Sequence, residues 1–242
     1  MRTKTAAGRG GRATHNGART AKEELNRDAV VDRALAIADV EGLDAVTIRR
    51  LATEFGVTPM ALYWHVSNKD ELLAAMGDRL FADIDVDALV STGPWQQQLR
   101  RITAALVRAL RAHPAAAMLG AQRVLFSETG CELAERVLQL LVKAGFGIGT
   151  ACDIASYAMQ TAVMLVAQRP GEPTSPADER DAVTTAKREA IAQLPRDRFP
   201  LLVESAEALT STDDEDAYYR FGIDLFIAGV EGIRPKGAKR AG

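Results

Sequence analysis

The segment of residues 47–69 carries two helix start signals with a glycine between them. Thr47 and Thr58 each follow a valine and can cap a helix, because a threonine hydroxyl accepts a hydrogen bond from a first-turn N–H group. Pro59 follows at the first helical position, where its missing N–H has no energetic cost. Gly56 can adopt the left-handed conformation that ends a helix. The segment therefore predicts a helix-turn-helix motif.

The second helix of this motif, expected over residues 59–66, carries adjacent aromatic side chains. Leu62 and Val66 share one face and can anchor it to the first helix, which leaves the other side chains on or near its outer side. Aromatic residues are more often part of the core. Tyr63 and Trp64 are adjacent, however, and cannot both face inward on a helix whose inner face is already occupied by the two anchors. Tyrosine and histidine can hydrogen-bond to phosphate, and rings can touch a thymine methyl. We interpret the tyrosine and the histidine as DNA contacts and leave the tryptophan between packing and contact.

The run LYWHVSNKDELL, the preceding LATEFGVTPMA and an earlier helix ending in Glu41-Gly42 together resemble the DNA-binding domain of the TetR family of transcriptional regulators. The resemblance is close from Asn26 to about Phe81 and looser from Trp95 through the final helix. It implies an all-α fold. In that fold, an N-terminal three-helix helix-turn-helix DNA-binding domain precedes a larger helical domain for ligand binding and dimerisation.

The resemblance also implies DNA-binding roles. In similar proteins an arginine one turn into the first helix of the motif reaches a guanine, a role that falls here to Arg49. Lys69 stands beside the free N–H groups of the next helix, which suits a phosphate, although a solvated lysine is the alternative. Arg50 is expected to be a surface residue or a phosphate contact. The expected DNA-binding residues are Thr47, Arg49, Thr58, Pro59, Met60, Tyr63, Trp64, His65 and Lys69.

Charge is unevenly distributed along the chain. Ten of the 30 lysines and arginines lie in residues 1–22 and 234–242, whereas all 32 acidic residues lie between them, which leaves that middle part with a formal charge of −12. The first tail is expected to be disordered and either follows DNA phosphates or serves only solubility. We expect a DNA-binding domain at residues 23–70 and a ligand-binding and dimerisation domain at residues 71–233.

Hydrophobic spacing predicts further helices along the body. A long helix capped by Ser67 or Asn68 is expected to reach about Ile84. The other expected helices cover residues 26–40, Trp95 to Pro114, a segment ending at Gly145, 152–168, 177–194, 199–209 and 218–233, with a proline-rich linker after residue 168.

Residues 152–168 and 218–233 are apolar nearly all round, so each must be buried on more than one side. In the TetR family the corresponding pair forms a four-helix dimer interface, and a crowded monomeric core is the alternative. Phe226 or Ile227 is expected to face the partner. A homodimer would place two recognition helices about 34–36 Å apart on a palindromic double-stranded DNA operator.

A small, mostly apolar inducer is expected in a cavity beneath the long helix, where it would shift the dimer away from DNA. Methionine, phenylalanine and glutamine side chains suggest an adaptable apolar cavity, although core packing is the alternative for each of them. The candidate ligand-binding residues are Leu106, Met118, Gln122, Phe126, Phe146, Met159, Gln160 and Met164.

An enzyme and a membrane protein are both disfavoured. The histidines have no carboxylate or cysteine partner in sequence, no cofactor or metal motif occurs, and no apolar run approaches the ~20 residues of a membrane span. Cys131 and Cys152 are expected to be reduced core residues. Family members that bind magnesium–tetracycline use histidines where Gly120 and Asp85 stand here, so that ligand is not expected. The leading hypothesis is a cytoplasmic, nucleoid-associated, ligand-responsive repressor; a helical scaffold would leave the recognition helix unexplained.

Overall fold

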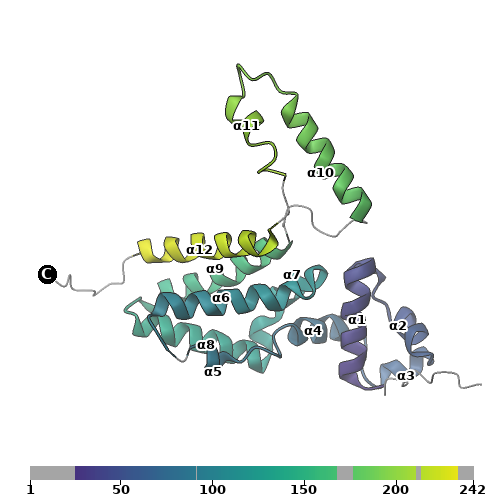
Figure 1. Ribbon diagram of the computed structural model, residues 1–242. Coiled ribbons are helices and arrows are strands. Elements are labelled where there is room, and N and C mark those ends of the chain that lie inside the picture. The colour runs from purple at the N-terminus through teal and green to yellow at the C-terminus, as the bar shows by residue number, and fades with distance from the viewer. Residues whose placement is uncertain (1–24, 91, 168–176, 211–213, 234–242) are drawn as a thin grey trace, which may run out of the picture.

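The computed structural model of the chain describes residues 25–90, 92–167, 177–210 and 214–233. Every regular element in these ranges is a helix, which confirms the predicted all-α class (Figure 1). The basic tails and the proline-rich segment 169–176 lie outside the described residues. The helices are α1 (Arg27–Glu41), η1 (Leu43–Ala45), α2 (Ile48–Phe55), α3 (Pro59–Tyr63), α4 (Lys69–Arg79), α5 (Val86–Leu89), α6 (Trp95–Arg111), η2 (Pro114–Ala116), α7 (Ala117–Arg123), η3 (Val124–Phe126), α8 (Glu128–Lys143), α9 (Ile148–Ala167), α10 (Ala177–Ala192), α11 (Pro200–Glu204) and α12 (Glu215–Gly232).

Helices α1 to α3 form a small N-terminal head at one end of the molecule (Figure 1). The Thr47 hydroxyl caps α2 by accepting a 3.1 Å hydrogen bond from the N–H group of Arg50. Gly56 ends that helix with a φ of 64°, the left-handed conformation that glycine tolerates. The helix-turn-helix is confirmed, but α3 ends at Tyr63 rather than at residue 66. Thr58 precedes α3 in an extended conformation and makes no side-chain capping hydrogen bond.

Helix α4 leads from the head into the body and is shorter than predicted. Asn68, the predicted cap, accepts a 2.8 Å hydrogen bond from the N–H group of Glu71. The helix ends at Arg79 instead of reaching Ile84, because residues 80–84 tighten into a turn of i→i+3 hydrogen bonds. Leu80 and Phe81 are both buried in this turn.

Helix α6 is the centre of the body and packs against α9 and α12 (Figure 1). Its predicted stripe is buried, which confirms the periodicity: Leu99, Ile102, Leu106 and Leu110. The helix already ends at Arg111, so Pro114 begins the following turn instead of stopping it. Trp95 meets Phe146 edge-to-face with ring centroids 5.2 Å apart. Both cysteines, predicted to be core residues, are exposed free thiols on α8 and α9.

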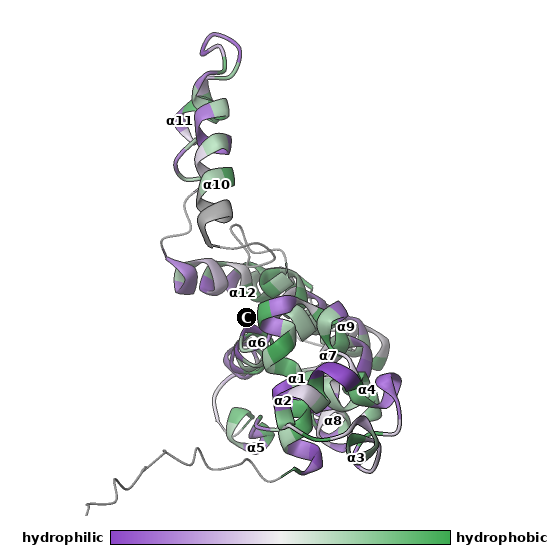
Figure 2. Cartoon of the chain, turned by 90° about the vertical axis from the view of Figure 1, so that its right-hand side faces the viewer, coloured by the Kyte–Doolittle hydropathy of each residue, from purple (hydrophilic) through white to green (hydrophobic). Residues whose placement is uncertain are grey.

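Helices α10 and α11 pack on each other and form an arm that stands off from the body (Figures 1 and 2). Its helix α11 has five residues, where the sequence predicted a helix over 199–209. Within the arm, the Arg188 guanidinium donates a 2.9 Å hydrogen bond to the Thr210 hydroxyl.

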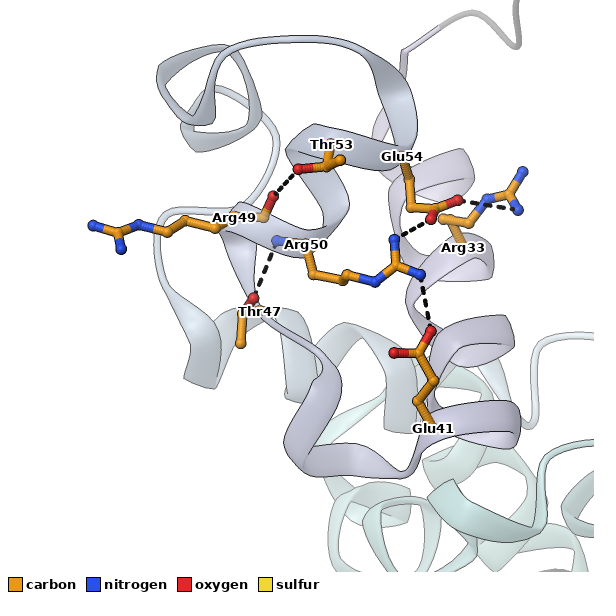
Figure 3. A network of polar contacts seen from close by, with 7 residues as sticks. All are labelled: Arg33, Glu41, Thr47, Arg49, Arg50, Thr53 and Glu54. Atoms are coloured by element: carbon orange, nitrogen blue, oxygen red, sulfur yellow. Dashed lines mark hydrogen bonds and ion pairs between the residues drawn. The ribbon is translucent and has the colours of Figure 1, made fainter. Parts of the chain in front are cut away.

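An ion-pair network holds α2 against α1 within the head (Figure 3). Arg50 lies 2.8 Å from Glu41 at the end of α1 and also pairs with Glu54 on α2, which in turn lies 3.7 Å from Arg33. The hydrogen bonds that the Arg50 guanidinium donates to the Glu41 and Glu54 carboxylates raise its pKa above the ordinary value. Arg49 points away from the network, so the two neighbouring arginines have different surroundings (Figure 3).

We predict that replacing Arg50 with alanine lowers the melting temperature, because the substitution leaves the Glu41 and Glu54 carboxylates without the cation between them. Thermal unfolding followed by circular dichroism measures the change, with Arg49→Ala as the matched control on the adjacent residue. Equal melting temperatures for the two variants would contradict a bridging role for Arg50.

Candidate nucleic-acid interface and ligand cavity

The outer surface of α3 carries large side chains that do not join the core. Met60 is 69% exposed, Tyr63 46% and Trp64 86%, whereas Leu62 between them is fully buried. The burial of Leu62 and Val66 and the exposure of both aromatics agree with the face assignment made from the spacing. A group of exposed large apolar side chains marks an interaction surface, whereas a single exposed one needs no explanation.

The other predicted DNA-binding residues lie on the neighbouring elements of the same head. Thr47 caps α2 and Arg49 lies in its first turn, while Thr58 and Pro59 begin α3. His65 is half-buried in the turn after α3, where its backbone N–H group donates a hydrogen bond to the Leu62 carbonyl. The structure thus brings the nine residues onto the helix-turn-helix with its caps, the turn after α3 and the first residue of α4.

The start of α4 is held by a reciprocal capping pair. The Glu71 carboxylate accepts a 2.8 Å hydrogen bond from the N–H group of Ser67, and Asn68 accepts one from Glu71. The hydrogen bond from Ser67 lowers the pKa of Glu71 below its ordinary value. This pair fixes the turn from which Lys69, the first residue of α4, projects its ammonium group.

A mostly apolar cavity of about 390 Å³ lies in the body between α6, α7, α8 and α9. Three of the eight candidate ligand residues line it: Leu106, Met159 and Gln160. Gln122, Met118, Phe126 and Met164 are exposed outside its lining, and Phe146 packs on Trp95. Sequence reasoning missed the other lining residues, half of which are small: Ala121, Ala134, Cys152, Ala155, Ser156 and Ala158.

The position of the cavity differs from the one expected beneath the long helix. Its described lining comes from α6 to α9 and includes no residue of α4. Helix α7 intervenes, since Ala121 and the following residues Val124 and Leu125 line the cavity while α7 packs against α4 on another side.

A second hollow of about 540 Å³ lies at the joint between head and body. Asp32 of α1, Arg79 of α4 and Arg108 of α6 line it together with His113. Arg79 lies 2.9 Å from Asp32 and 3.1 Å from Asp83, and the hydrogen bonds to these carboxylates, first that of Asp83, raise the pKa of the Arg79 guanidinium. None of the eight candidate ligand residues lines this hollow, although Arg79, Leu80, Asp83 and Ile84 belong to the segment beneath which the sequence predicted a cavity.

The residues present do not fit a magnesium ion in the body. A Cβ at Gly120 would lie 2.9 Å from Leu80 Cδ1 and 3.0 Å from Phe81 Cζ, which leaves no room for a histidine. Asp85 caps α5 by accepting a hydrogen bond from Ala88. Among the described residues no group of three or more histidine, cysteine or carboxylate side chains could hold a metal ion. The described helices also include none with the length and apolar character needed to cross a membrane.

Two family models match the chain. Residues 30–76 match the model of bacterial regulatory proteins of the tetR family, and residues 89–233 match the tetracyclin repressor-like C-terminal domain. The transcriptional repressor DrrR1 of Streptomyces coeruleorubidus is 27% identical over 216 residues, which cover 87% of this chain and 78% of that protein.

Solved structures show the same arrangement. A possible TetR family transcriptional regulator from Streptomyces coelicolor A3(2) aligns with a TM-score of 0.71 and 30% identity, covering 86% of this chain and all of the other. ActR from Streptomyces coelicolor, solved in complex with actinorhodin, aligns with a TM-score of 0.66 and 28% identity, covering 89% of this chain and 100% of that chain. The chain therefore belongs to the TetR family of bacterial transcriptional regulators.

Proposed function

We propose that the protein is a ligand-responsive repressor that binds a palindromic DNA operator as a homodimer and is released by a small, mostly apolar inducer. The Met60, Tyr63 and Trp64 surface at α3 carries the proposal, because these large side chains are exposed and stand on a helix-turn-helix. Family membership supports a regulator over an enzyme.

The proposed DNA contacts divide into two kinds. Arg49 contacts a base edge, because its guanidinium points outward and can donate two hydrogen bonds to a guanine (Figure 3). Tyr63, His65 and Lys69 contact phosphates, which positions the head without sequence choice. Arg50, whose guanidinium already bonds two carboxylates, supports the head from within rather than contacting DNA.

Selection of DNA from a random library by the full-length protein tests the function, and a palindromic consensus is the expected product. On that DNA, Lys69→Ala should lower the slope of log affinity against log salt by about one unit, since one phosphate contact releases about one counterion. Gel shifts over a salt series measure the slope, with Lys143→Ala in the body as the matched control. An unchanged slope for Lys69→Ala would make this lysine a bystander.

The homodimer is supported by an apolar face on α9 and α12. Phe221 is 71% exposed and Leu225 64%, and they lie one turn apart on α12, while α9 carries the exposed Tyr157 and Met164. The two helices pack closely, because Gly222 lies directly against Leu165.

The structure corrects the residues expected to face the partner. Ile227 is buried inside its own chain at 2% exposure, and Phe226 packs against the same core. Phe221 and Leu225 take that role instead, because α12 turns these positions outward.

Placing a carboxylate at the centre of this face should prevent dimerisation. In Leu225→Asp the charge would be buried at the interface without a partner, at a cost of about 3–5 kcal/mol, or roughly a hundredfold or more in the dimer dissociation constant. Sedimentation at micromolar concentration measures it, with Val40→Asp on the exposed surface of α1 as the control. A dimeric Leu225→Asp protein would place the interface elsewhere.

The cavity supports a mostly apolar ligand with few polar groups. Its walls are aliphatic and alanine side chains apart from Met159, Ser156, Gln160 and the Cys152 thiol, so Gln160 is the residue that would orient a polar atom of the ligand. The complex of ActR with actinorhodin supports a small-molecule ligand for this chain also.

A thermal-shift screen of lipophilic compounds should find ligands that raise the melting temperature and weaken DNA binding. At a hundred times the dissociation constant a ligand stabilises by about 2.7 kcal/mol, and linkage requires a reciprocal fall in operator affinity. Ala155→Phe fills the cavity and should abolish the thermal shift. Tight ligands that left operator affinity unchanged would indicate a constitutive repressor.

A further inference from the structure

A hollow of about 530 Å³ lies on the body where the start of α6 meets the second half of α8. Its lining comes from residues between 90 and 98 and between 136 and 144, and we call it the basal hollow. Helix α6 extends for about 25 Å from Trp95 in this hollow toward His113, which meets Asp39 of α1 at 2.7 Å (Figure 1). The basal hollow is therefore at the end of the body away from the head.

The basal hollow is separate from the two other sites of the body. Among the described residues, none that lines it also lines the apolar cavity or the hollow at the joint. Helix α8 contributes to both the basal hollow and the apolar cavity, but through different positions: Gln139 and Lys143 line the first, whereas Leu133 and Val137 line the second. A ligand in one of these sites does not occupy the other.

The charged side chains in the lining of the basal hollow are both cations, Arg136 and Lys143. The hollow at the joint differs, because carboxylates such as Asp32 and Asp83 line it beside its arginines. A concave site whose charges have one sign concentrates their field and attracts the opposite charge. In a chain whose acidic residues outnumber its basic ones, this arrangement favours an anionic ligand.

The two cations differ in their surroundings. Arg136 Nη2 lies 2.8 Å from Asp87 Oδ1, but the Asp87 side chain is 78% exposed, and ion pairs of this kind contribute little. Within the described ranges, no carboxylate pairs with Lys143. One negative charge on a ligand would therefore balance the cation that the protein leaves unneutralised.

Uncharged donors lie beside these cations. The Gln98 side-chain amide donates a 2.6 Å hydrogen bond to the Gly93 carbonyl, and the Gln139 amide donates a 2.8 Å hydrogen bond to the Glu135 carboxylate. Because a primary amide nitrogen carries two hydrogens, each glutamine keeps a second donor. Both residues line the hollow, so a bound carboxylate can accept hydrogen bonds from them as well.

The wall and the aromatic part of the basal hollow are held in place by the protein itself. The Arg101 guanidinium donates hydrogen bonds to the backbone carbonyls of Leu89, at 3.1 Å, and Thr92, which hold the residues before α6. The Trp95 ring packs edge-to-face on Phe146 with ring centroids 5.2 Å apart. A planar ligand ring can pack on this indole, and the volume lies within the roughly 300–1,000 Å³ of small-molecule sites.

We propose that the basal hollow binds an aromatic carboxylate. The ligand ring packs on Trp95, and its carboxylate lies between Lys143 and Arg136. The amides of Gln98 and Gln139 donate the remaining hydrogen bonds to it. This site does not depend on the proposed function, because its occupancy is measured without DNA.

Trp95 itself can report the binding. The chain has two tryptophans, so the full-length Trp64→Phe protein leaves Trp95 as its single indole fluorophore. Titration with sodium benzoate at constant ionic strength should change its emission in a saturable way, with a dissociation constant of about 1 mM. Benzyl alcohol lacks the charge and acetate lacks the ring, so both should bind about tenfold more weakly or less. A benzoate response that does not saturate, or equal binding of benzyl alcohol, would overturn the proposal.

Variants of the Trp64→Phe protein place the ligand. Lys143→Ala should weaken benzoate binding about tenfold, whereas Lys187→Ala removes the same charge from α10 and should have no effect. Ala155→Phe fills the apolar cavity and should leave the titration unchanged. Circular dichroism checks that each variant is folded. Unchanged binding by Lys143→Ala, or its loss in Ala155→Phe, would overturn the proposal.

Discussion

Burial of the inner face of α4 is the interaction on which the rest of the structure depends. Leu72, Met76 and Phe81 are fully buried along this face and its following turn. Each such side chain contributes about 1.5–3 kcal/mol, a substantial part of the 5–15 kcal/mol typical of a folded domain. The same face packs on α1 in the head and on α7 in the body, so one strip of apolar surface joins both parts.

Acidic side chains outnumber basic ones in the head as well as in the body, and this limits the positive charge that the head can present to DNA. The cations inside and around the joint are neutralised locally: Arg50 by Glu41 and Glu54, and Arg79 by Asp32 and Asp83. Since residues 23–233 carry a formal charge of −12, attraction to phosphate has to come from a few outward cations rather than from a basic domain. The capping pair at residues 67–71 therefore matters because it positions Lys69. The ion pairs of Arg50 matter because they hold α2, which carries Arg49.

The sequence predicted local features such as caps and turns well. It predicted poorly which face of a uniformly apolar helix is buried. Asn26, Thr47, Asn68 and the glycine at 56 act as expected, because caps and left-handed turns depend on a few adjacent residues. The exposed surface of α3 was also predictable, since its two anchors determined which side faced inward. By contrast, α9 is apolar all round, so spacing could not show that its cysteine lies on the outer face.

The sequence by itself determined the helical class, the helix-turn-helix and the large side chains that this motif leaves exposed, because periodicity and capping are properties of neighbouring residues. Only the tertiary structure decided where α4 ends, which residues of α12 face outward, and which side chains line the cavity. Those features depend on helices distant in sequence: Leu80 and Phe81 meet Gly120 of α7, and Leu165 of α9 meets Gly222 of α12. A cavity is the volume that several helices fail to fill together, so no single segment of the sequence can specify its lining.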